Sequence, residues 1–287
     1  MRRVRKSEVD DKSPAPRPGR GAGAPVDDFA LGAKLRHENN ASSDLKHWTD
    51  LKQKMSFTLT NVVPWGRSFG EYVEMFSLLR EDLHKRILGC GDGPASFNAT
   101  LTSHGGSIVS VDPLYRFSAD EVRRRIGETY AVVMDQTRKN MHEFTWTSIK
   151  TVDDLGKLRM KAMEEFLSDF PQGVKQGRYI DCELPRLPFA NGEFDLAVCS
   201  HLLFLYSEQL SEEFHVSSIH ELCRVAGEVR IFPLLELGAR TSRHLQAVSA
   251  RLVAAGYTVT IVTVPYEFQR GGDQMMTVKS FKSTHPE

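Results

Sequence analysis

The chain has 287 residues, of which 40% are hydrophobic and 26% charged, so it is long enough to bury a sizeable core. Its 37 lysines and arginines balance 37 aspartates and glutamates, which disfavours nucleic acid as the main partner because polyanion binding needs a basic surplus. The apolar runs are too short to cross a bilayer, and the four cysteines form no C-x-x-C pair, so we expect no membrane contact, no metal site and a cytoplasmic location.

The first part of the chain divides by composition. Residues 1–45 are rich in Arg, Pro and Gly and poor in bulky apolar side chains, which predicts a disordered basic tail. Residues 46–84 show apolar positions near a 3.6-residue period, which predicts a helical cover over the rest of the protein. Candidates to reach a ligand from this cover are Trp65, Arg67 and Tyr72. The alternative, slightly favoured, is that Trp65 and Phe69 only attach the segment to the core.

A glycine-rich turn follows the first predicted strand. Residues 86–90 run into Gly89-Cys90-Gly91-Asp92-Gly93-Pro94, and a helix is expected over 95–101. Glycine has no Cβ, so the backbone can adopt unusual dihedral angles and a ligand can lie against it. The next strand, 107–111, ends at Asp112, where a carboxylate can accept two hydrogen bonds from the hydroxyls of a ribose. The pattern predicts a site for a nucleoside cofactor.

The glycine spacing distinguishes between cofactors. A dinucleotide site has the form G-x-G-x-x-G, but here the third position is Pro94 and a glycine falls one residue earlier, at Gly93. The form G-x-G-x-G resembles the first motif of the class I S-adenosylmethionine-dependent methyltransferases. This resemblance implies that the turn surrounds the methionine moiety and that the acid after the second strand binds the ribose. The implied cofactor-binding residues here are Gly89, Cys90, Gly91, Gly93, Asp112 and Pro113.

The chain departs from that family's pattern at one position. Many members carry an acid two residues before the first glycine, near the ammonium group of the cofactor, and here that residue is Ile87. The ammonium group must then be bound by backbone carbonyls of the turn, by Asp92, or by a residue just after the fourth strand. The sequence does not distinguish among these three.

The segment between the second and third strands is longer than one connecting helix requires. Residues 116–176 are amphipathic, which predicts a helical insertion that roofs the cofactor side of the sheet. Four side chains in it are candidates for contact with the substrate: Arg124, Tyr130, His142 and Trp146. The alternative is a helical pair packed on itself with a solvated basic face, and the same stretch could equally support a homodimer.

A second motif extends the resemblance. Residues 179–201 look like the family's succession of an acid, a short loop, Leu-Pro-Phe, a turn and a buried strand. By resemblance, Asp181 accepts a hydrogen bond from the adenine amine, and the backbone amide of Cys182 donates to the ring. The loop is about two residues longer than usual, so the acid is either Asp181 or Glu183, and we favour Asp181.

The fourth strand ends at Ser200 and His201. Functional residues of a parallel doubly wound sheet lie at the carboxyl ends of its strands, so we expect Ser200 to contact the cofactor. His201 is the candidate catalytic residue, as a base that removes a proton from the acceptor. A partly buried histidine with satisfied hydrogen bonds is equally consistent with the sequence. Residues 202–206 are expected to enter a helix.

The remaining elements complete the expected fold. Residues 257–264 and 274–279 are expected to pair as a C-terminal antiparallel hairpin. We therefore predict an α/β protein with a doubly wound, mostly parallel, seven-stranded sheet, and the resemblance covers 85–280. It implies S-adenosylmethionine as cofactor and methyl transfer to an oxygen, nitrogen or carbon acceptor, with a small molecule favoured over a protein side chain. The alternatives are a noncatalytic binding protein of the same fold and an NAD-dependent oxidoreductase.

Overall fold

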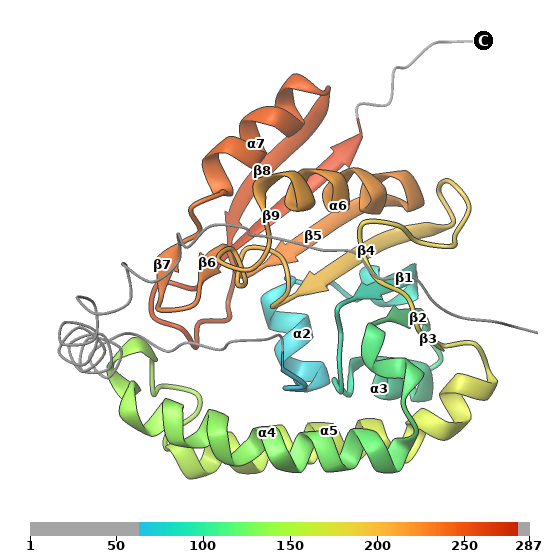
Figure 1. Ribbon diagram of the computed structural model, residues 1–287. Coiled ribbons are helices and arrows are strands. Elements are labelled where there is room, and N and C mark those ends of the chain that lie inside the picture. The colour runs from blue at the N-terminus through green and yellow to red at the C-terminus, as the bar shows by residue number, and fades with distance from the viewer. Residues whose placement is uncertain (1–62, 281–287) are drawn as a thin grey trace, which may run out of the picture. The chain divides into compact units, whose positions relative to one another are not determined.

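The computed structural model describes residues 63–280, and the predictions for residues 1–45 and 46–62 lie outside this range. A seven-stranded sheet forms the centre of the described part (Figure 1). Its strands are β1 (Arg86–Cys90), β2 (Ser107–Val111), β3 (Tyr179–Ile180), β4 (Phe194–Ser200), β5 (Ala226–Phe232), β8 (Tyr257–Thr263) and β9 (Gln274–Ser280). The order is β3-β2-β1-β4-β5-β9-β8, and β9 runs antiparallel to both of its neighbours. The predicted sheet and its C-terminal hairpin are confirmed. A separate pair consists of β6 (Leu235–Glu236) and β7 (Arg240–Thr241).

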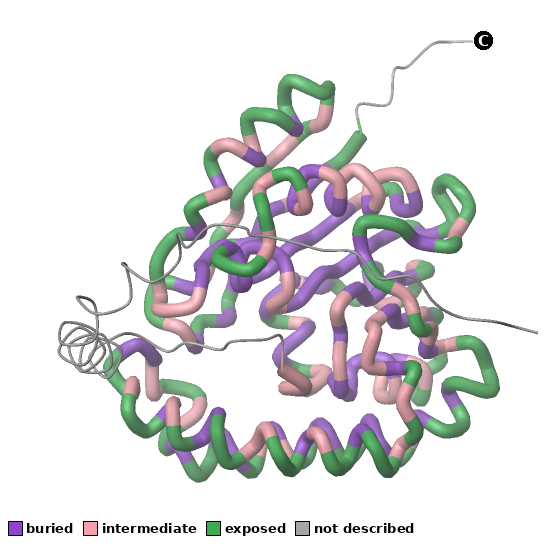
Figure 2. Tube along the Cα trace, in the orientation of Figure 1, coloured by how far each residue is buried: buried purple, intermediate pink, exposed green. Residues whose placement is uncertain are grey.

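Helices cover both faces of the sheet (Figures 1 and 2). They are α2 (Phe69–Met75), α3 (Phe97–Ser103), α4 (Ala119–Lys139), α5 (Val152–Lys175), α6 (Glu212–Val225) and α7 (Leu245–Ala254). Successive strand residues point to opposite faces. In β4, Leu196 and Val198 pack in the cluster formed with α2 and α3, whereas Ala197 and Cys199 pack in the cluster formed with α6 and α7. This burial on both faces explains the continuous apolar run at residues 196–199 of β4.

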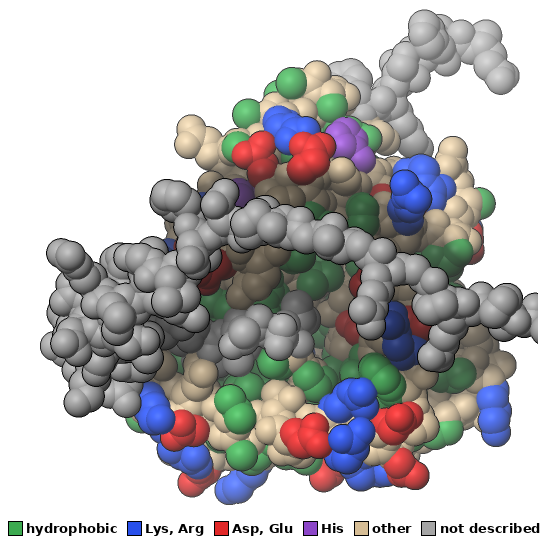
Figure 3. Space-filling view, viewed as in Figure 1, with side chains coloured by type: hydrophobic (Ala, Val, Ile, Leu, Met, Phe, Trp, Pro, Cys, Tyr) green, Lys and Arg blue, Asp and Glu red, His purple; other side chains and the backbone are tan. Residues whose placement is uncertain are grey.

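Two long helices, α4 and α5, occupy most of residues 116–176 and lie against each other (Figure 1). Ser118 caps α4 by accepting a hydrogen bond from the Glu121 amide, and Glu121 reaches back to the Ser118 amide. Oppositely charged side chains alternate on the surface of α4 (Figure 3). Exposed ion pairs on this helix include Arg123–Asp120 at 2.6 Å and Arg124–Glu128 at 3.1 Å. The inner surfaces pack in a cluster that contains Ile126 and Phe166.

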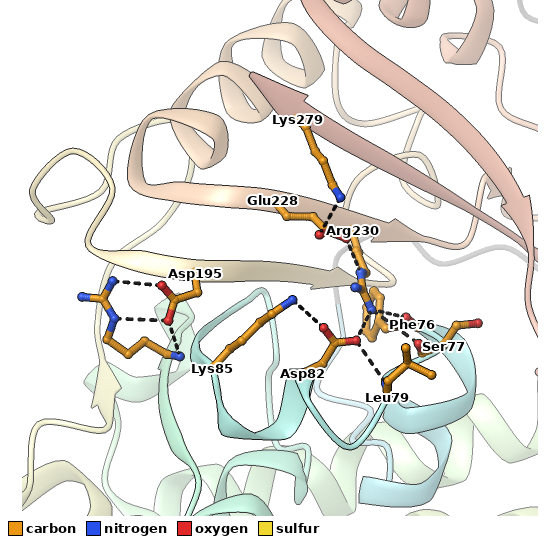
Figure 4. A network of polar contacts seen from close by, with 10 residues as sticks. Phe76, Ser77, Leu79, Asp82, Lys85, Asp195, Glu228, Arg230 and Lys279 are labelled. Atoms are coloured by element: carbon orange, nitrogen blue, oxygen red, sulfur yellow. Dashed lines mark hydrogen bonds and ion pairs between the residues drawn. The ribbon is translucent and has the colours of Figure 1, made fainter. Parts of the chain in front are cut away.

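The segment before β1 is attached to the sheet by a polar network (Figure 4). Arg230 in β5 donates from Nη1 to Asp82 Oδ2 at 3.0 Å and from Nε to Glu228 Oε1 at 2.7 Å. Lys279 in β9 lies 3.0 Å from Glu228, and Lys85 lies 2.6 Å from Asp82. These ion pairs join three separate parts of the chain without involving the glycine-rich turn.

The expected helix at 202–206 is wrong. This stretch forms consecutive turns, and His201 and Phe204 have positive φ angles of 54° and 59°, which are incompatible with a continuing helix. The turns direct the chain around the end of β4. Within residues 63–280, no helix combines the length and hydrophobicity that crossing a membrane requires.

Candidate functional site

A cavity of about 900 Å³ opens at the carboxyl ends of four parallel strands. Its lining includes Cys90 at the end of β1, Val111 at the end of β2, Ser200 at the end of β4 and Phe232 at the end of β5. This is where parallel sheets of this class bind ligands, and the volume lies at the upper end of the usual range for ligand pockets, about 300–1,000 Å³.

The glycine-rich turn forms one wall of the cavity. Gly91 and Gly93 line it with positive φ angles of 67° and 51°, a conformation that favours glycine. Gly89 lies behind the turn, where a Cβ would collide with the Asp92 carboxylate. The turn is held from outside by the Tyr115 hydroxyl, which donates to the Gly93 carbonyl at 2.9 Å.

Asp112 connects the turn to the end of β2. Its Oδ2 accepts from the Gly93 amide at 2.9 Å, and its Oδ1 accepts from the Leu114 amide at 2.8 Å. Burial raises the pKa of Asp112 to about 6, against the opposing effect of these two amides. Pro113 lines the cavity beside it. The Asp112 carboxylate thus lies at the cavity wall with each oxygen already oriented by one backbone donor.

A second carboxylate, Asp92, lies at the same wall and is only 7% exposed. It accepts hydrogen bonds from Ser110 Oγ at 2.6 Å and from the Tyr72 hydroxyl at 2.9 Å. Burial raises the pKa of Asp92 to about 6, and the nearby charge of Asp112 adds to this effect. Ile87, at the position where related motifs carry an acid, is fully buried in the core.

The two candidate adenine acids are placed differently. Asp181 is not among the described lining residues, and its Oδ1 lies 3.1 Å from Arg116 Nη2 in an ion pair at the surface. Glu183 and Cys182 do line the cavity. Burial raises the pKa of the Cys182 thiol to about 11, so this residue is a neutral wall group.

His201 and Ser200 are brought together at the cavity by the turn after β4. Ser200 Oγ lies 2.9 Å from His201 Nδ1, and both residues line the cavity. Burial lowers the pKa of His201 well below 6.5, and the charges of Arg67 and Arg159 lower it further. The imidazole is therefore neutral near pH 7, so it can accept a proton but has little driving force to keep one.

A buried ionic cluster lies at the cavity, where its members Arg159 and Tyr266 line the wall, and sequence reasoning missed most of it. Arg159 in α5 is 0% exposed and donates from Nη1 to Glu71 Oε2 at 2.6 Å. The Tyr266 hydroxyl donates to Glu71 Oε1 at 2.9 Å. Arg159 lies four residues after Leu155 and four before Met163, on the buried stripe of its helix. An arginine on an apolar stripe was the available signal.

The residues predicted to reach a ligand from the cover (46–84) line the cavity, whereas those predicted from the insertion (116–176) do not. Trp65, Arg67 and Tyr72 all line the cavity. Among the described lining residues, none of the four insertion candidates is found: Arg124, Tyr130, His142 and Trp146. Instead, α4 and α5 contribute residues from their inner faces, including Thr129 and Leu155. Within residues 63–280, no group of His, Cys, Asp and Glu side chains is arranged to hold a metal ion.

Comparison with known proteins gives one clear relative. No family model matches the chain. The chain is 32% identical over 222 residues to the uncharacterized protein MJ0045 of Methanocaldococcus jannaschii, a match that covers 77% of this chain and 97% of that protein.

The solved structures that resemble the chain share little sequence with it and superpose on it only in part. A TehB-like SAM-dependent methyltransferase from Corynebacterium glutamicum is 12% identical with a TM-score of 0.40, over 84% of this chain and 98% of that one. The PH0226 protein from Pyrococcus horikoshii is 9% identical with a TM-score of 0.40, over 74% and 90%. The fold assignment therefore stands on the strand order and directions described above. The chain belongs to the same family as MJ0045, and its fold is that of the class I methyltransferases.

Proposed function

We propose that this protein is an S-adenosylmethionine-dependent methyltransferase. The observation that carries the proposal is the Asp112 carboxylate, which lies at the cavity wall and is hydrogen-bonded to the Gly93 amide of the glycine-rich turn. A ribose would bind at this carboxylate through its two hydroxyls, while the backbone of the turn would lie along the methionine moiety.

The charges at the wall fit this cofactor. Asp92 and Asp112 have raised pKa values because burial penalises their ionised forms. A ligand that carries a sulfonium and an ammonium group would stabilise both carboxylates. Asp92 is our proposed partner for the ammonium group, in place of the acid that the motif lacks at Ile87. For the adenine amine, Asp181 stays our prediction, with Glu183 as the alternative that the cavity lining favours.

When bound, the cofactor supplies a methyl group on a positively charged sulfur. The chain holds the acceptor in line with that group, and alignment alone can lower the barrier by several kcal/mol. Where the acceptor loses a proton, His201 is the proposed base, with Ser200 fixing the orientation of its ring at Nδ1. The acceptor is proposed to be a small molecule, because α4, α5 and the loop that carries Tyr266 contribute to the cavity wall.

Our remaining proposals concern the organisation, the location and the oligomeric state of the protein. They are the division into a cover (46–84) and a methyltransferase domain (85–280) with an insertion at 116–176, the cytoplasmic location and the homodimer. Oligomeric state is directly measurable by analytical ultracentrifugation.

Calorimetric titration tests the proposal. S-adenosylmethionine and S-adenosylhomocysteine are expected to bind the wild type, and Asp112→Ala is expected to weaken both by about a hundredfold, the worth of two hydrogen bonds to a charged group. Asp195→Ala is the matched control, because Asp195 is an exposed carboxylate that pairs with Arg86. Circular dichroism checks that each variant is folded.

Three outcomes oppose the proposal. If neither sulfur ligand binds at millimolar concentration, the isolated chain is not such an enzyme. If NADH binds instead, the oxidoreductase alternative is correct. If Asp112→Ala binds as tightly as Asp195→Ala, the ribose contact has been assigned to the wrong carboxylate.

A further inference from the structure

One part of the cavity wall carries two guanidinium groups close to a single carboxylate. Arg67 and Arg159 both line the cavity, and the carboxylate that neutralises them is Glu71. Burial lowers the pKa of Arg67, and the charge of Arg159 lowers it further, so the two guanidinium groups act on each other. His201 is neutral and does not compensate. Among the described residues, Glu71 is the carboxylate that acts on both cations, whereas Asp92 and Asp112 lie at the glycine-rich turn. This part of the wall therefore carries more positive than negative charge, and a buried charge that is incompletely paired is costly.

The same two side chains have unused hydrogen-bond donors. Arg159 Nε and Arg67 Nε are both buried and have no hydrogen-bond partner in the described structure. Arg159 uses Nη1 for Glu71 and has a 3.5 Å contact from Nη2 to the Tyr266 hydroxyl, while Arg67 donates from Nη1 to the Trp65 carbonyl at 3.2 Å. Buried donors of this kind are rare in folded proteins and call for an explanation. A ligand with a hydrogen-bond acceptor at this position would explain them.

The wall near this cluster is apolar and aromatic. Phe144, Phe232 and Phe268 are buried and line the cavity together with Leu155. Phe144 and Phe268 stack with ring centroids 4.9 Å apart. A ligand here would therefore place a flat or apolar body against these rings and an anionic group toward the arginines.

We infer that the methyl acceptor is a small organic anion, with a carboxylate or phosphate held by Arg67 and Arg159 and an apolar body against the phenylalanine side chains. This inference rests on the proposed function, because it assigns the glycine-rich turn and Asp112 to the cofactor. Arg159 belongs to α5 and Tyr266 follows β8, so this subsite is built from elements other than those of the turn. Guanidinium groups suit carboxylates and phosphates because their planar donors match both.

The same arginines could instead bind the carboxylate of the cofactor's methionine moiety. Arg67 lies close enough to the turn for this, since its carbonyl accepts from the Ser96 amide just after Pro94. The experiment therefore uses protein saturated with S-adenosylhomocysteine, which already carries that carboxylate. Benzoate and phenyl phosphate are the probes, benzamide is the neutral control, and ionic strength is held constant.

Titration calorimetry is expected to show that benzoate or phenyl phosphate binds the saturated protein and that benzamide does not. Arg67→Gln should weaken binding of the anion by about tenfold or more, which corresponds to the loss of one hydrogen bond to a charged group. The affinity for S-adenosylhomocysteine should stay unchanged. Arg86→Gln is the matched control, because Arg86 is an exposed arginine paired with Asp195. Glu71→Gln should instead strengthen binding of the anion, because it removes the carboxylate that competes for the arginines. If the arginines had only a structural role, the two variants would not change the affinity in opposite directions.

Two results overturn the inference. Either no anion binds the saturated protein, or Arg67→Gln weakens S-adenosylhomocysteine while leaving 5′-methylthioadenosine, which lacks the carboxylate, unaffected. The second result assigns the arginines to the cofactor. If S-adenosylhomocysteine does not bind at all, the proposed function fails. The anions are then titrated into the free protein, where loss of binding in Arg67→Gln still establishes the anion subsite, and absence of binding refutes it.

Discussion

Replacement of Asp92 by Asn should stabilise the protein at alkaline pH. Asp92 is 7% exposed, and burial raises its pKa from its usual value of 3.8 to about 6. A carboxyl group with a raised pKa in the folded state contributes stability that is complete below pH 3.8 and is lost as the pH rises through 6. That difference in pKa corresponds to about 3 kcal/mol of lost stability at pH 8.

Asp92→Asn removes the charge but keeps the size of the side chain. The gain is reduced by weaker hydrogen bonds from Ser110 and Tyr72, each worth about 1 kcal/mol. We therefore expect a net stabilisation of about 1–2 kcal/mol at pH 8. The change of this stabilisation with pH is a more precise test, because the hydrogen-bond contributions are nearly the same at both pH values and largely cancel. The advantage of the variant over the wild type should shrink by about 1.4 kcal/mol between pH 8 and pH 5, since the wild type is mostly protonated in the folded state at pH 5.

Urea unfolding followed by circular dichroism measures both free energies at each pH. Asp195→Asn is the control, because Arg86 lowers the pKa of Asp195 below 3.8, so the free energy of unfolding of that variant relative to the wild type should not change between pH 8 and pH 5. An advantage of Asp92→Asn that is equal at pH 8 and pH 5 would refute the argument that burial of a charged carboxylate destabilises this wall.

Two further predictions concern the cofactor and the core. S-adenosylmethionine should bind about tenfold more weakly at pH 5 than at pH 8, because protonation through pH 6 removes the carboxylate charge of Asp92 or Asp112 that favours a cation; calorimetry at the two pH values measures this, and equal affinities would contradict it. Phe97→Ala should reduce the free energy of unfolding by about 3–5 kcal/mol, because Phe97 is fully buried and its ring stacks on Tyr72 at 4.5 Å between centroids; a loss under 1 kcal/mol in urea would show that the aromatic packing around α3 is dispensable.

The sequence alone predicted the sheet because its signals are local. An apolar strand, a turn with glycines that adopt positive φ and an acid after the next strand lie within about thirty residues, and the structure has this order of elements. The C-terminal hairpin was equally visible, since two β-rich runs flank a Gly-Gly turn. The boundaries differ slightly from the prediction: the helix after the glycine-rich turn, α3, begins at Phe97 rather than Ala95.

The tertiary structure decided which charged side chains face the cavity. Arg124 and Arg159 both lie on amphipathic helices, yet Arg124 pairs with Glu128 at the surface and Arg159 is fully buried against Glu71. Glu71 precedes Arg159 by 88 residues, so no local pattern connects them. Periodicity and turn chemistry act over a few residues and are written in the sequence, whereas the pairing of buried charges depends on which helix faces which after folding. For this protein, local sequence determined the sheet and the glycine-rich turn, and only the folded chain brought Arg159 of α5 to Glu71 of α2 and to Tyr266.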